Sequence, residues 1–351
     1  MKRFLYIFIC LELFFTLSLA AAWAAIPLPK LAINVNETSV SGLSSGAFMT
    51  SQFYLSYSDI MVGAGIVAGG PYLCAQSWVG QDYLTNATTA CMKPLTPMSA
   101  PNTPLLEKLT KKLDAENLID PLVNLANDKI YLFSGHADQV VSTNVVNQTQ
   151  KFYKDLGVPA QSLRYVTNVD AGHALITADK TDSTCNITQP PFINNCGFNQ
   201  AWDILNFIYA NLTAPGQGEA KGKIIEFNQT EFIDSPYSSM SASAFVYVPD
   251  QCRAGGCKLH IVFHGCLQGA AVIGDHYYAK TGYNPIADAN NFIVLYPQVQ
   301  PSTTTPFNPQ GCWDFWGYSD PISARHDYFS KQAPQIRAVR AMVTRLSQPA
   351  Q

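Results

Sequence analysis

Residues 42–46 read Gly-Leu-Ser-Ser-Gly, a G-x-S-x-G pattern centred on Ser44 in a chain of 351 residues. A β-branched stretch precedes the pattern and a helix-like stretch follows it, which predicts that Ser44 lies on a tight turn between a strand and a helix. Such a turn exposes the serine hydroxyl, but serine at its ordinary pKa is a poor nucleophile and needs a neighbouring base. The pattern therefore indicates acyl-transfer chemistry, provided that the chain also supplies a histidine and a carboxylate.

A suitable acid and base follow two later strands. Asp138 comes just after the predicted strand at residues 129–135, and His173 comes just after the next predicted strand, Ser-Leu-Arg-Tyr-Val-Thr-Asn. The order serine, acid, histidine, with the acid and the base each on a loop after a strand, is that of the α/β-hydrolases. We predict a triad of Ser44, Asp138 and His173, in which His173 takes the serine proton and Asp138 fixes the histidine tautomer.

Other interpretations of these residues exist. His136 is an alternative base, but it precedes the strand that should come before the base. Asp170 is an alternative acid, but it lies only three residues before His173. The non-catalytic interpretations are a serine-rich turn at Ser44 and a surface role for Asp138.

An acyl-transfer site also needs two hydrogen-bond donors for the oxyanion of the tetrahedral intermediate. The backbone N–H of Ser45, the residue after the nucleophile, is one expected donor. The second donor normally lies on a loop after an early strand, often with a His-Gly motif. That motif occurs late in this chain, as His264-Gly265 within Leu-His-Ile-Val-Phe-His-Gly-Cys-Leu-Gln-Gly.

The position of the serine is unusual for this class of fold. Several strands normally precede the nucleophile, whereas strands here are predicted after it, at residues 242–249, 258–265 and 291–298. The later strands include the one that leads into the His-Gly loop. We therefore predict an α/β fold of the circularly permuted α/β-hydrolase type, with a mostly parallel central sheet, helices on both faces and disulfide staples.

The remaining helices and strands are predicted from the spacing of hydrophobic residues and from the positions of turn-forming residues. A buried strand is expected at residues 61–70. A helix is expected directly after Ser44. Further helices are expected in the stretches TNVVNQTQKFYKDLG and NQAWDILNFIYANL and at residues 332–346. Residues 213–223 are the best linker candidate. We nevertheless expect residues 25–351 to form a single catalytic domain, because neither half holds a complete site.

The first 24 residues have the character of a secretory signal peptide. Lys2 and Arg3 precede an apolar run that ends at the A-x-A-like site Ala22-Trp23-Ala24. We expect a secreted protein, extracellular or periplasmic, with no stable membrane anchor. An uncleaved anchor is the alternative interpretation of the same run. No later stretch approaches the ~20 apolar residues of a spanning helix.

The cysteines predict disulfides. Nine cysteines occur, and Cys10 lies in the predicted signal peptide, which leaves an even number in the exported chain. Eight cysteines allow on the order of 100 pairings. Short-range pairing favours Cys74–Cys91, Cys185–Cys196 and Cys252–Cys257, which leaves Cys266–Cys312. A metal site is the rival interpretation, but the chain has no C-x-x-C and no paired histidine spacing, so we expect no metal.

The composition limits the partners. Charged residues are 13% of the chain and aromatic residues 12%, against roughly 25% charged residues in an average protein. The predicted signal peptide carries two cations and one anion, so its removal changes the formal net charge from −3 to −4. This excludes an obvious nucleic-acid binder. A surface with so few charges suits contact with an apolar or insoluble substrate.

The motifs VSGLSSGAFMTSQF, AGGPYLCA, KIYLFSGHADQVV, HGCLQ, LYPQ and GCWDFWGY together resemble the extracellular poly(3-hydroxybutyrate) depolymerases, in their single-domain, circularly permuted group. The resemblance covers nearly all of the chain after residue 24. It implies hydrolysis of short-side-chain polyhydroxyalkanoate esters by Ser44, Asp138 and His173, without a metal or cofactor. It also implies an oxyanion hole made by the backbone N–H groups of Ser45 and Cys266.

The chain departs from this family at two points. We expect no separate substrate-binding domain or Thr-rich linker, which many members of the family carry. In the aromatic run after Cys312, the family's usual second tryptophan is Phe315, which puts the polymer preference in doubt. Trp313 and Phe315 are candidate substrate-binding residues, and the alternative is that they are core aromatics behind the site.

Three functions remain open at this stage. The first is a secreted, monomeric serine esterase that acts on poly(3-hydroxybutyrate) or a related polyester through an acyl-enzyme. The second is an esterase for small or plant-wall esters, such as feruloyl or acetyl groups. The third is a non-catalytic binding protein on the same fold, because function depends on the site rather than on the fold.

Overall fold

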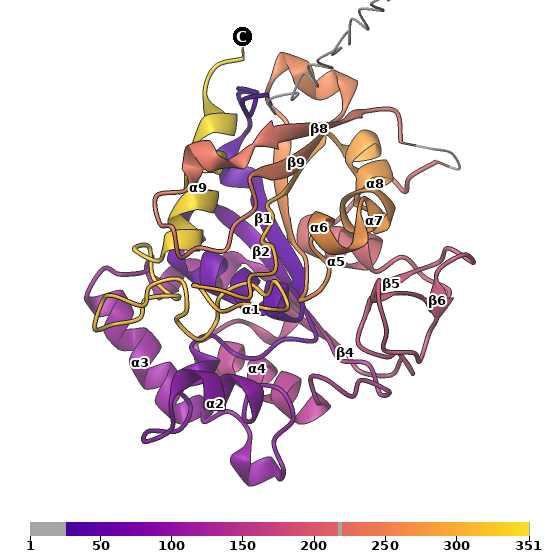
Figure 1. The fold of residues 1–351 in the computed structure, drawn as a ribbon. Helices are drawn as coiled ribbons and strands as arrows, with labels where there is room; N and C mark the ends of the chain where they lie inside the picture. The colour runs from indigo at the N-terminus through magenta and orange to yellow at the C-terminus, as the bar shows by residue number, and fades with distance from the viewer. Residues whose placement is uncertain (1–25, 217–219, 351) are drawn as a thin grey trace, which may run out of the picture.

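One sheet of eight strands unites the two halves of the chain (Figure 1). The computed structural model describes residues 26–216 and 220–350, so the predicted signal peptide lies outside the described residues. The strand order is β4 (Leu163–Val166), β3 (Lys129–Phe133), β2 (Met61–Val67), β1 (Thr38–Leu43), β10 (Lys258–Phe263), β11 (Phe292–Tyr296), β9 (Ser243–Val248) and β8 (Lys223–Asn228).

The strand β1 joins the two series of strands. It pairs in parallel with β2, which follows it in the chain, and with β10, which comes more than two hundred residues later. Among the eight strands of the described sheet, β9 alone runs opposite to the others. The prediction of a mostly parallel sheet with a permuted strand order is therefore confirmed. The carboxyl ends of the parallel strands meet at one edge of the sheet, where α/β proteins place their sites.

Helices cover both faces of the sheet. On one face lie α1 (Ser45–Ser56), α4 (Thr143–Asp155) and α9 (Pro334–Ser347), and on the other lie α5 (Gln200–Tyr209) and α8 (Tyr283–Asn290). Every residue of α1 is buried, which explains why this helix has no amphipathic pattern. The shorter helices are α2 (Tyr83–Thr88), α3 (Thr103–Ala115), α6 (Ala270–Ile273) and α7 (His276–Lys280).

Two parts of the sheet structure were not predicted. The strand β8 begins at Lys223, the last residue of the predicted linker, and it is a largely exposed edge strand without a strict alternation of apolar residues. A small second sheet contains β5 (Leu175–Thr177), β7 (Ile193–Asn195) and β6 (Ser183–Thr184). Its strands are too short for a period of two to be visible in the sequence.

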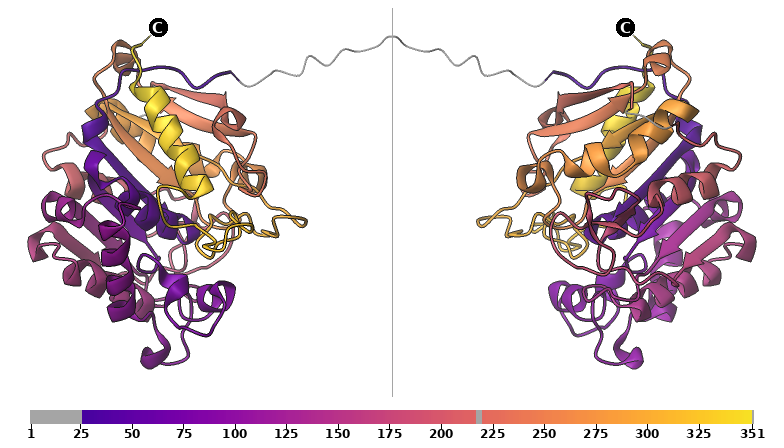
Figure 2. Two further views of the ribbon diagram at one scale, coloured as in Figure 1. Left: turned by 90° about the vertical axis from the view of Figure 1, so that its left-hand side faces the viewer. Right: turned by 90° about the vertical axis from the view of Figure 1, so that its right-hand side faces the viewer.

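The first and last described segments lie against one another (Figure 2). The N–H of Leu31 donates to the carbonyl of Leu346 at 3.1 Å, and the N–H of Ala32 donates to that of Gln348 at 2.9 Å. Segments that meet at the surface in this way are the condition under which a fold tolerates circular permutation.

A buried polar network fixes the register of β1 against β10. The ring of His260 bonds Ser39 Oγ through Nδ1 at 2.7 Å and Ser41 Oγ through Nε2 at 2.8 Å. Tyr283 Oη on α8 and Tyr209 Oη on α5 bond the same two serines. Burial lowers the pKa of His260 to about 3, so the ring is neutral at ordinary pH. A slip of one residue would leave these polar groups unpaired in the core, which is costly.

Asp128, just before β3, carries a buried carboxyl that faces α1. Tyr54 Oη donates to Asp128 Oδ2 at 2.8 Å, and both residues are buried. Burial raises the pKa of Asp128 from the ordinary value of 3.8 to about 7, although the Tyr54 hydrogen bond opposes the shift. The folded chain thus holds this proton more tightly than the unfolded chain does. The stability that the proton contributes is complete below the unfolded pKa and is lost as the pH rises through the folded pKa.

The substitution Asp128→Asn should therefore stabilise the protein increasingly as the pH rises from about 4 to about 8, by up to about 4 kcal/mol. The asparagine stays neutral and its carbonyl keeps accepting from Tyr54. Thermal unfolding at several pH values measures the difference from the parent. Tyr54→Phe is the control. Loss of its donor should raise the pKa of Asp128 further, so the decline of stability should extend to a higher pH than in the parent. A stability difference that is constant with pH would contradict this account.

Candidate active site

Ser44 lies between β1 and α1, at the carboxyl edge of the sheet. Its backbone has φ 58° and ψ −123°, a conformation that a non-glycine residue adopts only under strain and that is typical of a nucleophile elbow. It occupies the N-cap position of α1, yet its side chain makes no capping hydrogen bond. The hydroxyl is therefore left available for chemistry.

The two glycines of the elbow allow the turn to lie directly on the end of β10. A Cβ at Gly42 would meet the carbonyl oxygen of Gly46 at 2.4 Å. A Cβ at Gly46 would meet the carbonyl oxygens of Phe263 and His264 at 2.3 and 2.4 Å. Real Cβ atoms do not approach backbone oxygens so closely, so side chains at either position would push the nucleophile away from the loop after β10.

Asp138 and His173 form a buried hydrogen-bonded pair. The distance from His173 Nδ1 to Asp138 Oδ2 is 2.8 Å. The other carboxylate oxygen, Oδ1, accepts the backbone N–H groups of Val140 at 2.8 Å and of Val141 at 2.9 Å. A carboxylate held in this way can only accept from the ring, which places the proton on Nδ1 and leaves Nε2 as the base. Ser44 lies close to this pair.

The loops that carry the acid and the base are bonded to each other. The N–H of His136 donates to Val169 O at 2.9 Å, and the N–H of Ala137 donates to Ala171 O at 3.0 Å. His136 and Asp170, the alternative base and acid, both have exposed side chains. The structure thus brings together the three predicted triad residues and leaves the two alternatives at the surface.

The loop after β10 lies beside the nucleophile. A Cβ at Gly265 would meet Ser44 Cβ at 3.3 Å, so the loop backbone and the serine are in direct contact. His264 Nε2 accepts the N–H of Val299 at 3.2 Å, so Nδ1 carries the ring proton and donates to Gly265 O at 2.7 Å. Burial lowers the pKa of His264 to about 4, which keeps the ring neutral and this arrangement intact.

Two backbone N–H groups are free to serve an oxyanion. Within the described residues, the N–H groups of Ser45 and Cys266 donate to no protein group. Ser45 is the first residue of α1, where the aligned peptide dipoles favour negative charge. Among the described residues, no group of three or more His, Cys, Asp or Glu side chains is arranged to hold a metal ion.

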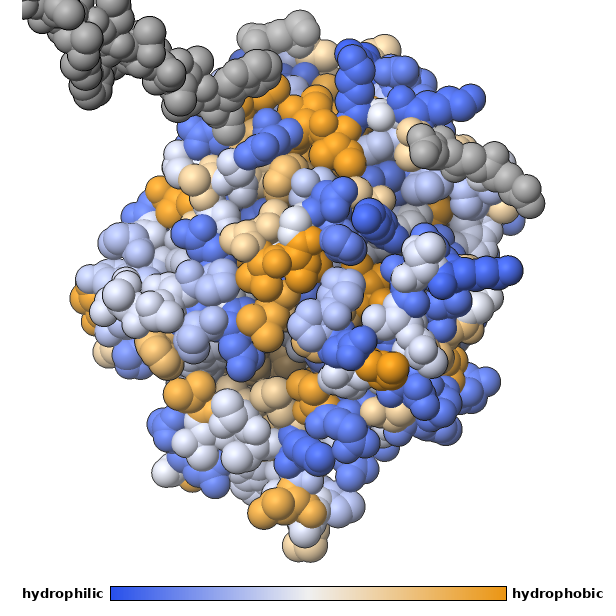
Figure 3. All heavy atoms as spheres, turned by 45° about the vertical axis from the view of Figure 1, so that its right-hand side comes forward, coloured by the Kyte–Doolittle hydropathy of each residue, from blue (hydrophilic) through white to orange (hydrophobic). Residues whose placement is uncertain are grey.

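A cavity of about 270 Å³ opens beside Ser44. Its wall is largely apolar and consists of Ser44, Phe48, Leu84, Ala87, Thr88, Met92, Val141, Cys266, Phe307, Asn308, Pro309, Gln310, Cys312, Phe315 and Trp316. Figure 3 shows a face of the molecule on which apolar residues gather around a hollow. The cavity can hold the acyl part of an ester next to the serine hydroxyl.

The aromatic run after Cys312 divides between the cavity and the core. Phe315 lines the cavity and stacks on Phe48 with ring centroids 4.2 Å apart and an interplanar angle of 7°. Trp316 also lines the cavity and meets Phe315 edge-on at 5.0 Å. Trp313 is fully buried and packs against Phe263 behind the cavity wall. The structure therefore places Phe315 at the cavity and Trp313 behind it.

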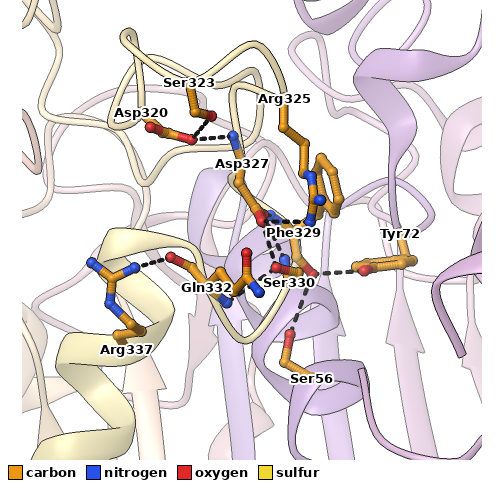
Figure 4. Close-up of polar contacts among 10 residues, drawn as sticks. All are labelled: Ser56, Tyr72, Asp320, Ser323, Arg325, Asp327, Phe329, Ser330, Gln332 and Arg337. Atoms are coloured by element: carbon orange, nitrogen blue, oxygen red, sulfur yellow. Dashed lines mark hydrogen bonds and ion pairs between the residues drawn. The ribbon is translucent and has the colours of Figure 1, made fainter. Parts of the chain in front are cut away.

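The segment after this run is held on α1 and on the loop after β2. The carbonyl of Phe329 accepts from Tyr72 Oη at 2.6 Å and from Ser56 Oγ at 3.2 Å (Figure 4). Asp327 Oδ1 accepts the N–H groups of Phe329 at 3.1 Å and of Ser330 at 2.9 Å. These bonds fix the far end of the segment that supplies one wall of the cavity.

The structure contains four disulfides, in the four pairs favoured by the sequence. Cys74–Cys91 closes the segment that leads into and out of α2, and Cys252–Cys257 lies before β10, away from the cavity. Cys185–Cys196 closes the loop after His173. Cys266–Cys312 joins the loop after β10 to the aromatic run, and both cysteines line the cavity.

Several cavity residues were not predicted from the sequence. Phe48, Leu84, Met92, Phe307 and Trp316 come from α1, from the segment around α2 and from the segment after β11. Only the aromatic run around Trp316 carried a visible signal. The others are single apolar residues in helices or loops, and nothing in their local pattern separates a cavity wall from a core.

No protein-family model matches the chain. A poly(3-hydroxybutyrate) depolymerase of Delftia acidovorans is 40% identical over 329 residues, which cover 92% of this chain and 62% of that relative. A polyhydroxybutyrate depolymerase of Talaromyces funiculosus is 35% identical over 312 residues, which cover 85% of this chain and 87% of the relative. The chain thus spans less than two thirds of the length of the first of these relatives.

Two solved structures are similar over 93% of this chain and over the whole of their own chains. One is the PHB depolymerase from Penicillium funiculosum, and the other is a PHB depolymerase variant complexed with an R3HB trimer. Each has a TM-score of 0.81 and 32% sequence identity to this chain.

The Cys266–Cys312 bridge ties the loop after β10 to the aromatic run at the cavity. The double substitution Cys266→Ala with Cys312→Ala should lower stability by about 4 kcal/mol, from loop-closure entropy, and should lower turnover of a small ester. Turnover should fall because the bridge holds the loop that presents the Cys266 N–H. Thermal unfolding and initial rates measure the two effects.

The matched control is Cys252→Ala with Cys257→Ala, a bridge that does not touch the cavity. It should cost about 2 kcal/mol of stability and leave the turnover number near that of the parent. Equal turnover losses in the two double variants would refute a specific role for the Cys266–Cys312 bridge.

Proposed function

The chain belongs to the poly(3-hydroxybutyrate) depolymerase family, and we propose that it is a secreted serine esterase that hydrolyses poly(3-hydroxybutyrate) or related short-chain polyhydroxyalkanoates. The observation that carries the proposal is the buried Asp138–His173 pair, which lies close to Ser44 on a strained turn beside an apolar cavity. A binding protein on this fold would have no use for a hydroxyl kept free of its capping bond. We further propose that residues 25–351 form one catalytic domain that acts as a monomer.

The proposed reaction uses the groups described above. Ser44 Oγ attacks the ester carbonyl carbon while His173 Nε2 takes the hydroxyl proton. The N–H groups of Ser45 and Cys266 bind the oxyanion. Collapse of the tetrahedral intermediate expels the alcohol, which receives the proton from His173, and leaves an acyl-Ser44. Water then attacks the acyl group by the same steps, with Asp138 stabilising the imidazolium each time it forms.

The surface beside the cavity favours a polymeric substrate over a small ester. Val79, Leu95 and Met98 are 90%, 97% and 88% exposed on the segment around α2, and Leu84 and Thr88 of the same segment line the cavity. A second groove on this segment includes Leu95, Met98 and Thr88. Exposed apolar side chains that continue outward from a cavity indicate an interaction surface. A solid polyester is a suitable partner for it.

Export fits the same proposal. The disulfides require an oxidising compartment, and the sequence begins with the features of a signal peptide. Within residues 26–216 and 220–350, no helix is long and apolar enough to cross a membrane.

The substitution Ser44→Ala tests the chemistry. We expect the hydrolysis of both poly(3-hydroxybutyrate) granules and p-nitrophenyl butyrate to fall by roughly 10⁴-fold or more, because triad members act as a unit. The fold should survive, as thermal unfolding would show. Activity close to that of the parent would rule out Ser44 as the nucleophile. Hydrolysis of p-nitrophenyl butyrate or methyl ferulate without clearing of granules would favour a small-ester function.

The double substitution Leu95→Ser with Met98→Ser tests the surface. It should lower adsorption to granules and the rate of granule clearing, while kcat/KM for p-nitrophenyl butyrate stays within about twofold of the parent. Val123→Ser is the matched control. Val123 is 74% exposed on the 3-10 helix just before β3, at the amino end of that strand, whereas the cavity lies at the carboxyl ends of the strands. Losses of equal size on granules and on the soluble ester would show that the segment supports the site rather than the polymer.

A further inference from the structure

Gln268 has a side chain that is fully buried and fully hydrogen-bonded between two loops of the site. Its Oε1 accepts the N–H of Gly265 at 2.7 Å, and its Nε2 donates to the carbonyls of Pro191 at 2.9 Å and Phe192 at 3.1 Å. We propose that Gln268 is a positioning residue that couples the oxyanion loop to the loop that holds the base His173. The proposal rests on the function proposed above.

The amide oxygen of Gln268 fixes the conformation of the oxyanion loop. The N–H of Gly265 is held by Gln268, and the carbonyl of Gly265 is held by His264 Nδ1 at 2.7 Å. The orientation of the peptide unit that contains the Cys266 N–H follows from these two bonds. Without the Gln268 bond, Gly265 would have a buried unpaired N–H next to Ser44 Cβ, and the loop would turn to satisfy it.

The amide nitrogen of Gln268 fixes the loop that holds the base. Phe192 lies edge-on to the His173 ring with centroids 6.5 Å apart, and it has a positive φ of 56°. Its carbonyl accepts both from Gln268 and from the N–H of Leu175, two residues after His173. On the same loop, Thr188 Oγ1 accepts the backbone N–H of His173 at 2.9 Å. This loop therefore touches the base at its ring and at its backbone, and Gln268 anchors it.

A primary amide is the chemical group that this position requires. One oxygen must accept from an N–H, while one nitrogen donates to two carbonyls. A methionine has similar length and no strong hydrogen-bonding groups. A glutamate keeps an acceptor for Gly265, but as a carboxylate it has no donor for Pro191 and Phe192. The methionine therefore lacks all three bonds, and the glutamate lacks those to Pro191 and Phe192.

The test is the kinetics of Gln268→Met and Gln268→Glu on p-nitrophenyl butyrate. We expect kcat of the Met variant to fall about 10- to 100-fold, which is no more than the fall in kcat that follows removal of one oxyanion donor. KM should stay within about twofold of the parent. The Glu variant keeps an acceptor for the Gly265 N–H, but its buried carboxylate would face two carbonyl oxygens, so its kcat should fall at least as far as that of the Met variant. The rate of Ser44 phosphorylation by diethyl p-nitrophenyl phosphate should fall in parallel, because it uses the same oxyanion donors and base.

Asn284→Leu is the control. Asn284 on α8 is also buried; it donates to the carbonyl of Tyr278 at 2.9 Å and accepts from Tyr296 Oη at 2.7 Å, and none of these three residues lines the cavity. Its substitution removes buried side-chain hydrogen bonds outside the two site loops, so it should lower stability while kcat stays within about threefold of the parent.

The outcomes separate positioning from folding. Equal kcat losses in the Gln268→Met and Asn284→Leu variants, or a rise in KM without a fall in kcat, would overturn the proposal. Failure of both Gln268 variants to fold would make Gln268 a folding residue and would also overturn it. An inactive parent protein would refute the proposed esterase function instead, and an active parent with inactive Ser44→Ala shows that the chemistry stands independently of Gln268.

Discussion

The parallel contact between β1 and β10 is the interaction on which the site depends. It joins strands from opposite ends of the chain, and the two loops that leave its carboxyl edge carry the nucleophile and the oxyanion donor. The absence of a side chain at Gly46 lets the elbow rest on the carbonyls of Phe263 and His264. The His260 network sets the register within the same pair of strands. A shift in this contact would therefore separate Ser44 from the Cys266 N–H, the proposed oxyanion donor.

Buried amide side chains hold several of the loops around the site. Gln268 joins the oxyanion loop to the base loop, Gln52 bonds the carbonyl of Asp314 from α1, and Gln335 bonds the N–H of Asp314 from α9. A buried amide can satisfy backbone donors and acceptors without the desolvation cost of a buried charge. Asp314 itself carries a buried carboxyl, and its oxygens accept the backbone N–H groups of Trp316, Gly317, Tyr318 and Ser319.

Rigidity and exposure are distributed unevenly around the cavity. The wall formed by Phe315 and Trp316 is tied down by the Cys266–Cys312 bridge, by stacking on Phe48 and by the bonds of the following segment. The opposite wall comes from the segment around α2, which carries exposed apolar side chains and few charges. One wall is thus fixed beside Ser44, while the other carries the exposed apolar side chains that we propose as the contact for a large apolar substrate.

The sequence by itself determined the chemistry of the site and the topology of the fold. The tight serine turn, the acid and base after successive strands and the late His-Gly loop are local signals, because each needs a particular residue next to a strand end. The same signals predicted the permuted sheet, and the spacing of the cysteines favoured the short-range pairs. The strand β8 and the small second sheet were missed because they are short or exposed and have weak periodicity.

Only the tertiary structure decided which residues surround the reacting serine. It placed Phe315 at the cavity and Trp313 behind it, although they are two positions apart in one aromatic run. It also brought Phe48, Leu84 and Phe307 to one cavity from three distant segments. The role of Gln268 depends on carbonyls more than seventy positions away. Such contacts depend on how the sheet brings its loops together, and a local pattern of residues carries no information about that.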